Sequence, residues 1–338
     1  MSGGSDIDGT AAMTARASGR ARLDWVDALK GLGIIAVVAG HVWTRGAVRD
    51  AIYTVHMPLF FILSGYTARH VPWRQFVPRL SHALLVPFVS FSILLLGADF
   101  LIESVRGMRP IFGSWLSGGA TILFATDALR GPFTILWFIP SLFLARFAWN
   151  GLAKSGRNPD DRVVLLPIGI VFALALAAQY LGGRSPFGVL AVPGALLLIW
   201  MGAMWRLWSR PQPLAVLAFV ALALATLIWL PPVNMKLGYL GWPVASLIGA
   251  GAVTVALALL LQHMPPLVIV KLAALGRASL VIMYVHVAFI HYLAPYMQKT
   301  TLFLVALAAA FGLDWLIRRT KVTRILLLGE ARTANQSR

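Results

Sequence analysis

The sequence has no cysteine among its 338 residues, which excludes a disulfide framework, a thiolate metal site and a cysteine nucleophile. Charged residues are scarce as well, at 12% of the chain against roughly 25% in soluble domains. Hydrophobic residues, by contrast, make up 59%. The surroundings of most of this chain are therefore lipid rather than water.

Acidic residues are few: 12 Asp and Glu stand against 29 Lys and Arg, for a net charge of +17. An excess of this kind indicates nucleic-acid binding when the basic residues form one patch or stripe. Here they punctuate the apolar runs instead, as the topology signals of a membrane protein do. We therefore expect a lipid bilayer around the chain and no nucleic acid among its partners.

The apolar runs are long enough to cross a membrane. Residues 215–230 (AVLAFVALALATLIWL) and 246–261 (SLIGAGAVTVALALLL) contain no ionisable group, and with their flanks they reach the ~20 residues that a helix needs. Polar and apolar residues do not alternate in them, as they would in barrel strands. The sequence predicts an all-α, polytopic integral membrane protein of about ten transmembrane helices. The expected spans are residues 26–44, 51–68, 82–102, 133–149, 163–181, 187–206, 213–230, 241–262, 276–293 and 301–317.

Ten spans put both termini on one side of the membrane. That side then holds 21 of the 29 Lys and Arg residues, and the other side holds 8. The richer side faces the cytoplasm, so we expect both termini to be cytoplasmic. The short, glycine-containing segment 111–126 is expected to be re-entrant or interfacial.

Three regions follow from this division. Residues 1–22 have no apolar core, so we expect a disordered cytoplasmic tail and no signal peptide. Residues 23–320 form the expected transmembrane domain. Residues 321–338 are expected to be a basic cytoplasmic C-terminal tail.

Ionisable residues inside the first two spans are the main functional signal, because burying such groups is costly unless they are paired or used. Asp27, Lys30 and His41 lie on one predicted helix, and the eleven-residue step from Lys30 to His41 is almost three turns, or ~16 Å of rise. Lys30 and His41 therefore share a face. His56, one turn after Tyr53, approaches His41 across a short hairpin.

A neutral imidazole can take a proton from a hydroxyl and return it near pH 7, as general-base catalysis of acyl transfer requires. We predict His41, His56 and Asp27 as catalytic residues. A single histidine at a helix end is more often an interfacial hydrogen-bonding group, and only the grouping with Asp27 and Lys30 favours catalysis. The 7 His residues show no metal-ligand spacing, so we expect no metal.

Arg74 and Arg79 precede the third span. Arginine forks bind phosphate oxygens bidentately, so these two residues and Lys30 are candidates for holding a phosphate-containing ligand. Anchoring at the membrane surface is the alternative for the arginines. Five further residues are candidates to line a cavity: Tyr53, Ser64, Trp137, Tyr284 and His286. The alternative for each is a role in packing between helices.

Together these residues resemble the acyltransferase type 3 family of integral membrane acyltransferases, which includes sugar and exopolysaccharide O-acetylases. The resemblance covers residues 23 to 320, approximately. Its matching pieces are Asp27-x-x-Lys30, the ten residues between Lys30 and His41, HMPLFFILSG (56–65), LWFIPSLF (136–143) and GRASLVIMYVH (276–286). Family members often have two arginines separated by two residues before the third span, whereas here Arg79 is followed at that spacing by His82.

The resemblance implies an O-acyltransferase of the bacterial inner membrane, expected to be an O-acetyltransferase. Its donor would be cytoplasmic acyl-CoA, expected to be acetyl-CoA, used as a substrate with no permanently bound cofactor. Its acceptor would be a hydroxyl of a surface or secreted polysaccharide or of a lipid-linked oligosaccharide precursor, and glycan-assembly proteins are candidate partners. His41 would be the catalytic base, and Lys30, Arg74 and Arg79 would bind acyl-CoA.

Two other classes stay open on the sequence. A multi-pass transporter or exporter of a glycan or small solute would use the intramembrane charges and histidines as a path. It predicts solute flux without consumption of acetyl-CoA. A non-catalytic scaffold for glycan assembly predicts that Lys30 and His41 are dispensable.

Overall fold

The computed structural model describes residues 6–154, 157–181, 183–208 and 212–330. Within these ranges the chain forms helices, and its only β-pairing is an isolated bridge between Asn234 and Tyr239. The α-helices are α1 (Asp6–Val42), α2 (Ala47–Thr67), α3 (Trp73–Val105), α4 (Trp115–Phe124), α5 (Phe138–Leu152), α6 (Arg162–Leu181), α7 (Val192–Trp205), α8 (Pro213–Trp229), α9 (Pro243–Leu261), α10 (Pro266–Arg277), α11 (Ser279–Leu293), α12 (Lys299–Ile317) and α13 (Lys321–Leu328). Short 3-10 turns are η1 (Thr126–Ala128), η2 (Gly131–Phe133), η3 (Pro186–Ala191), η4 (Met235–Leu237) and η5 (Ala294–Tyr296).

Eight of the helical segments in the described ranges are long and apolar enough to cross a membrane. They are Asp24–Val42, Trp73–Val105, Gly131–Leu152, Arg162–Tyr180, Pro186–Trp205, Pro243–Leu261, Ser279–Tyr296 and Lys299–Ile317. Helices α2 and α8 coincide with the other two expected spans, and α8 has 17 residues. The chain is thus a polytopic all-α membrane protein, whereas the count of ten spans stays a prediction.

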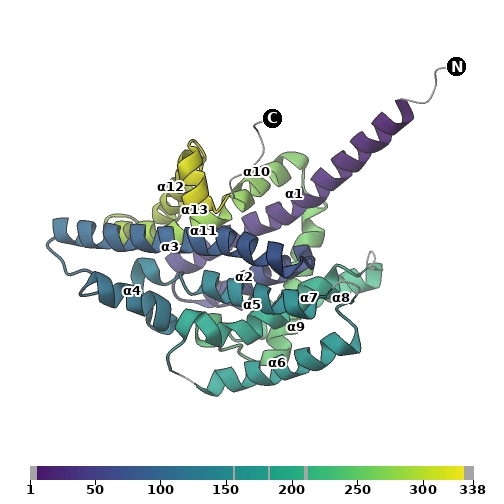
Figure 1. Cartoon of the computed structure of the whole chain (residues 1–338), viewed down its shortest axis with the longest axis horizontal. Helices are drawn as coiled ribbons and strands as arrows, with labels where there is room; N and C mark the ends of the chain where they lie inside the picture. The colour runs from purple at the N-terminus through teal and green to yellow at the C-terminus, as the bar shows by residue number, and fades with distance from the viewer. Residues whose placement is uncertain (1–5, 155–156, 182, 209–211, 331–338) are drawn as a thin grey trace.

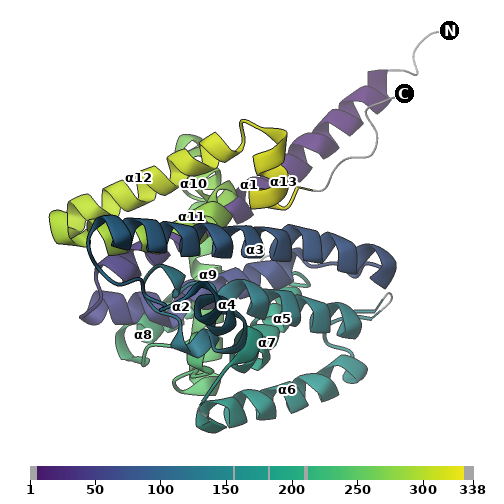
Figure 2. The same ribbon diagram turned by 60° about the vertical axis from the view of Figure 1, so that its left-hand side comes forward.

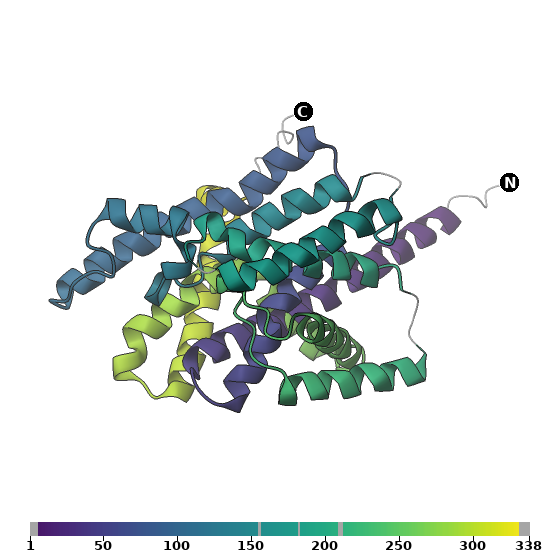
Figure 3. The same ribbon diagram turned by 90° about the horizontal axis from the view of Figure 1, so that it is seen from below.

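The helix bundle has two ends, and positions along the bundle are given relative to them. The terminal end is where α1 begins its apolar part at Asp24 and where α2 ends and α3 begins; the opposite end carries the turn between α1 and α2. The first part of α1 projects beyond the other helices, and α6 lies on the far side of the bundle from α12 (Figures 1 and 2). Seen from below, α1 runs obliquely through the molecule toward the turn that leads into α2 (Figure 3).

Glycines bring the site helices into close contact. A methyl group built on Gly65 of α2 would lie 1.8 Å from the Ile199 carbonyl oxygen of α7, and one on Gly276 of α10 would lie 1.7 Å from the Asp27 carbonyl oxygen of α1. No other residue allows backbones to approach this closely, as is common in membrane helix packing. Two motif glycines, in HMPLFFILSG and GRASLVIMYVH, therefore set the positions of α2 and α1.

The middle of helix α11 lies in the interior of the bundle. Its residues Val281 to Val287 are all buried, on every side of the helix. A helix that is apolar all round belongs in the interior. The one ionisable imidazole in this stretch, His286, is consequently held in the middle of the protein.

Both expected tails contain helix. Residues 6–22, predicted to be disordered, continue α1 as helix, because alanine, arginine and methionine are good helix formers that extend an existing helix at little cost; residues 1–5 lie outside the described residues. Residues 321–328, predicted to be tail, form the amphipathic helix α13, capped by Thr320. The His82 imidazole Nδ1 donates to the Gly329 carbonyl at 3.0 Å and docks the end of α13 on α3. Residues 331–338 lie outside the described residues.

Three further segments bear on the expected boundaries. Segment 111–126 contains the ten-residue α4, too short to span, consistent with a re-entrant or interfacial piece. Helix α3 begins at Trp73 rather than at residue 82, so Arg74 and Arg79 lie on its first turns. Helix α10, which the sequence did not predict as a separate element, packs against α1.

Candidate active site

Three histidines meet within the bundle. His41 lies at the end of α1, His56 in α2 and His286 in the middle of α11. The ring centroids of His41 and His286 are 5.1 Å apart. The Tyr53 ring lies between His41 and His56, with its centroid 6.2 Å from that of His41 and 4.7 Å from that of His56. We call His41, Tyr53, His56 and His286 the imidazole cluster. The predicted approach of His56 to His41 occurs through Tyr53.

Backbone carbonyls fix two of the rings. His56 Nδ1 lies 2.8 Å from the Ile52 oxygen and His286 Nδ1 lies 2.7 Å from the Ile282 oxygen. A carbonyl oxygen only accepts, so each Nδ1 carries the hydrogen, and in a neutral ring Nε2 is then the acceptor. His286 is fully buried and its Nε2 has no hydrogen-bond partner among the described residues. The cluster thus contains a fixed, unused acceptor next to His41.

Arg49 adds a positive charge at the opposite end of the cluster. Its guanidinium carbon lies 3.9 Å from the Tyr53 ring centroid, and Nη1 pairs with Asp50 at 2.9 Å. A guanidinium over an aromatic face is held by a cation–π interaction. Arg49 keeps the Tyr53 ring in its place between the histidines.

A separate cavity of about 220 Å³ lies toward the terminal end and contains Lys30. We call it the Lys30 cavity. Lys30 Nζ pairs with Asp27 Oδ1 at 3.0 Å. Across the cavity Arg146 of α5 donates to Ser64 Oγ at 3.1 Å. The cavity therefore presents two cations and the Ser64 hydroxyl between α1, α2, α5 and α11.

The Lys30 cavity and the imidazole cluster share helix faces. On α2, Ser64, Phe60 and His56 follow one another at four-residue steps, and on α11 Met283 and His286 lie one turn apart. The cavity is lined by Phe60 and Met283 but by none of the three histidines. No described cavity contains both Lys30 and His41. Phe60 and Met283 are the lining side chains of the Lys30 cavity that lie one turn from His56 on α2 and from His286 on α11. We call these two side chains the barrier.

Asp27 does not join the imidazole cluster. It precedes His41 by fourteen residues, about 21 Å along a helix, and its carboxylate pairs with Lys30. The structure thus places Asp27 beside Lys30 and apart from the three histidines, and its catalytic role stays a prediction. Its contact makes it a positioning residue for Lys30.

The other predicted residues divide between surface and core. Arg74 and Arg79 are exposed on α3 and line neither the Lys30 cavity nor the pocket at the end of α5 described below. Tyr284 is buried, stacked on Phe91 with ring centroids 4.4 Å apart. Trp137 is buried against Phe138. Of the cavity candidates, Ser64 lines the Lys30 cavity, and Tyr53 and His286 belong to the imidazole cluster.

Sequence reasoning missed buried or half-buried ionisable residues inside the predicted spans, among them Asp99, Arg146 and Asp314. Arg146 lies inside a predicted span, as does Asp99, which is fully buried and accepts from Tyr292 Oη at 2.8 Å and from the Ile111 amide at 2.9 Å. An ionisable residue inside a span is itself a functional signal, so each was detectable. Asp99 ties α3 to α11 and to the segment after α3, whereas Arg146 points to the Lys30 cavity.

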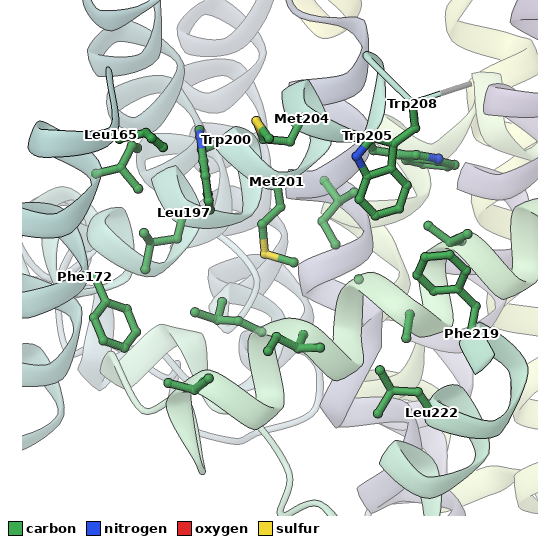
Figure 4. Close-up of a pocket in the computed structure, with 18 of the residues that line it drawn as sticks. Leu165, Phe172, Leu197, Trp200, Met201, Met204, Trp205, Trp208, Phe219 and Leu222 are labelled. Atoms are coloured by element: carbon green, nitrogen blue, oxygen red, sulfur yellow. The ribbon is translucent and has the colours of Figure 1, made fainter. Parts of the chain in front are cut away.

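A larger cavity of about 630 Å³ lies elsewhere, among α6, α7, α8 and α9. Figure 4 shows Phe172, Met201 and Phe219 among its apolar lining. The Trp200 indole N–H, also on its wall, is donated to the Pro159 carbonyl at 3.0 Å. A cavity with this lining offers no acid, base or charge for catalysis, whereas the imidazole cluster and the Lys30 cavity contain such groups.

No group of three or more His, Cys, Asp or Glu residues in the described ranges is arranged to hold a metal ion. The fold and the site instead define an integral membrane protein with a buried imidazole cluster and a separate cationic cavity. A comparison with protein families matches residues 23–319 to the family described as "Acyltransferase domain". The chain belongs to this acyltransferase type 3 family of membrane proteins, as its motifs predicted. No curated protein and no solved structure matched the chain.

Proposed function

We propose that the chain is an O-acyltransferase, in particular an O-acetyltransferase of the bacterial inner membrane with both termini in the cytoplasm. It would take the acyl group from cytoplasmic acyl-CoA. The acceptor would be a hydroxyl of a surface or secreted polysaccharide or of its lipid-linked precursor. Membership of a family of membrane acyltransferases favours this function over the transporter and the scaffold.

The observation that carries the proposal is the pairing of His41 with a second, fixed imidazole. His286 lies with its ring centroid 5.1 Å from that of His41, its Nδ1–H bound to a carbonyl and its Nε2 unpartnered. Burial of an acceptor without a partner costs about 1–3 kcal/mol and is retained where it has a use. A use that fits is to orient or relay the proton of a neighbouring base.

The reaction balances with His41 as the general base. The acceptor oxygen attacks the thioester carbonyl carbon while His41 takes the hydroxyl proton. The tetrahedral intermediate then collapses, the carbon–sulfur bond breaks, and the CoA thiolate takes the proton from the His41 imidazolium. The products are an ester of the acceptor and free CoA thiol, and His41 returns to its starting state.

Lys30 and Arg146 supply the positive charge of the donor side. Both line the Lys30 cavity, where an anionic ligand meets two cations and the Ser64 hydroxyl. We place the barrier between this cavity and His41. Transfer therefore requires Phe60 or Met283 to move, as the flexible thioether of a methionine can.

Replacing His41 with Ala tests the proposal. We expect acetyl transfer to fall by about 10²–10⁴-fold, the usual contribution of a general base. Membranes carrying the protein would be given acetyl-CoA and glycan acceptor, and released CoA would be measured with a thiol reagent. The chain itself has no cysteine to react.

His263→Ala is the matched control, because His263 is exposed and lies on the connection between α9 and α10. It should transfer at the wild-type rate. Equal activity of the two variants would refute His41 as the base.

A further inference from the structure

A second, smaller pocket lies at the terminal end, where α5 ends and α7 ends. It has a volume of about 140 Å³. Its lining includes three cations, Lys154, Arg157 and Arg206, together with His70 and Asn158, and no carboxylate. We call it the basic pocket.

Buried polar contacts build one wall of the basic pocket. Asn150, only 2% exposed, exchanges two hydrogen bonds with the Val71 backbone, accepting from N at 3.0 Å and donating to O at 3.0 Å. His70 Nδ1 donates to the Asn150 carbonyl at 3.2 Å, and Arg206 donates to the Ala68 carbonyl. Segment 68–71 is thus fixed by hydrogen bonds from both sides, so a ligand that binds here loses less free energy to ordering of the protein.

The opposite wall is fixed as well. The Pro159 carbonyl accepts from the Trp200 indole at 3.0 Å, and the Asn158 amide donates to the Asp161 carboxylate at 2.7 Å. Asp160 and Asp161 are the nearby acids; Asp161 contacts the Asn158 backbone amide, and neither acid lines the pocket or forms an ion pair with the three cations of the pocket among the described residues. The cations of the pocket are therefore left for an anion.

The basic pocket continues the Lys30 cavity along two elements. On α5, Leu142 and Arg146 line the Lys30 cavity, and Trp149 and Ala153 line the basic pocket on the same helix face. The step from Arg146 to Ala153 is about 10 Å of helix. At the end of α2, Thr67 lines the Lys30 cavity and the following Ala68 lines the basic pocket. An elongated ligand can thus lie along α5 with one end in each.

We propose that the basic pocket binds phosphate groups at the nucleotide end of the acyl donor, a proposal that rests on the proposed function. A pocket of about 140 Å³ is below the roughly 300–1,000 Å³ of sites that enclose a whole ligand. It therefore takes phosphates and leaves the base and sugar outside. Two arginines offer the planar forks that bind phosphate oxygens in pairs.

The assignment replaces Arg74 and Arg79 as the phosphate-binding residues. Those two side chains are exposed on α3 and line neither the basic pocket nor the Lys30 cavity. The thioester end of the donor lies in the Lys30 cavity, below the barrier. From the end of α5 inward, the donor would then place its phosphates in the basic pocket, its linker along the helix and its thioester in the Lys30 cavity.

The test measures binding rather than transfer. Purified protein in nanodiscs of neutral lipid would be titrated with CoA and with adenosine 3′,5′-bisphosphate. The variant is Lys154→Gln/Arg157→Gln, since both residues are exposed in the connection between α5 and α6. Charge-assisted hydrogen bonds are the strong ones, so we expect binding of both ligands to weaken by about tenfold or more, with the melting temperature unchanged.

A rival variant of equal charge, Arg74→Gln/Arg79→Gln, should bind CoA as the wild type does. If this variant loses CoA and Lys154→Gln/Arg157→Gln does not, the proposal is overturned and the sequence-based clamp is restored. If the wild type binds CoA and both variants bind it equally well, the basic pocket is not the phosphate site, while the proposed function stands. If the wild type binds no CoA, the donor of the proposed function is itself wrong.

A last arm replaces neutral lipid with phosphatidylglycerol, whose phosphate has the same chemistry. Competition by this lipid at Lys154 and Arg157 without any effect of these residues on CoA binding would assign the basic pocket to a lipid headgroup and overturn the proposal. Loss of CoA binding in the Lys154→Gln/Arg157→Gln variant in both lipids supports it.

Discussion

At the scale of single residues, the site depends on two imidazoles whose hydrogen positions the backbone sets. His56 and His286 each donate Nδ1–H to a carbonyl one turn earlier in the same helix. This arrangement leaves each Nε2 as the acceptor of a neutral ring. His41, which has no such bond among the described contacts, is the ring free to change its proton during a reaction.

The substitution His286→Leu separates the contribution of His286 to catalysis from its effect on the stability of the protein. Leucine removes the buried, unpartnered Nε2, which costs about 1–3 kcal/mol where it stands. We expect the melting temperature to rise and kcat for acetyl transfer to fall by about tenfold or more, within the range of acid–base effects. The KM for acetyl-CoA should not change, because His286 does not line the Lys30 cavity.

Tyr284→Phe is the matched control on the same helix. It removes the other unpartnered polar atom of α11, the Tyr284 hydroxyl, from a ring stacked on Phe91. This variant should gain stability and keep full activity. A His286→Leu variant with a lowered melting temperature and normal kcat would show that His286 only fills space.

At the scale of helices, the proposed function requires the donor to pass the barrier to reach His41. Met283→Trp would enlarge the barrier, and overpacking of a core typically costs 1–3 kcal/mol without loss of the fold. We expect CoA binding to persist and acetyl transfer to fall by about tenfold or more, because only the step past the barrier is obstructed. CoA titration measures binding and a single-turnover assay measures transfer, so both applied to the same preparation distinguish a loss of binding from a loss of transfer.

Met204→Trp provides the comparison, since Met204 borders the apolar cavity of about 630 Å³, where a larger ring has space. It should leave binding and transfer intact. Unchanged transfer in Met283→Trp would mean that the thioester reaches His41 by another route.

The helices also indicate how far sequence alone reaches. Apolar length predicted the spanning helices, and spacing predicted that Lys30 and His41 share a face, because both follow from the geometry of a single helix. The meeting of His286 with His41 could not be predicted in this way, since it depends on how α11 packs against α1. Likewise the barrier depends on α2 and α11 lining the same cavity, which no single-helix pattern indicates.

The short amphipathic helix α13 was also not predicted from the sequence. Helix α13 combines two basic residues, Lys321 and Arg324, with apolar ones, and the sequence therefore indicates part of a basic tail. Its docking depends on His82 and on Gly329, whose φ of 64° favours glycine. Neither contact leaves a signal within residues 321–328 themselves.

At the scale of the whole molecule, the open question is the path of the chain across the membrane, and α8 is the critical element. Its 17 residues are about 26 Å long, against a hydrocarbon core of about 30 Å. A short helix is accommodated by local thinning at a cost of fractions of a kcal/mol per Å. The helix contains no ionisable residue, so crossing is the arrangement that leaves the fewest charges in lipid.

The absence of cysteine makes this topology directly measurable. Single cysteines would replace Gln212, before α8, and Lys236, after it, in intact cells treated with an impermeant thiol reagent. With ten spans, position 236 reacts from outside and position 212 only after the membrane is opened. Burial lowers the pKa of the native Lys236 amine, with Asp127 opposing, so position 236 lies in a partly enclosed turn and labelling there should be slow but complete. Reaction of both positions from the same side would remove α8 from the spans. It would also place α9 and the helices after it in the opposite orientation and separate α13 from the cytoplasmic side on which the donor is proposed to bind.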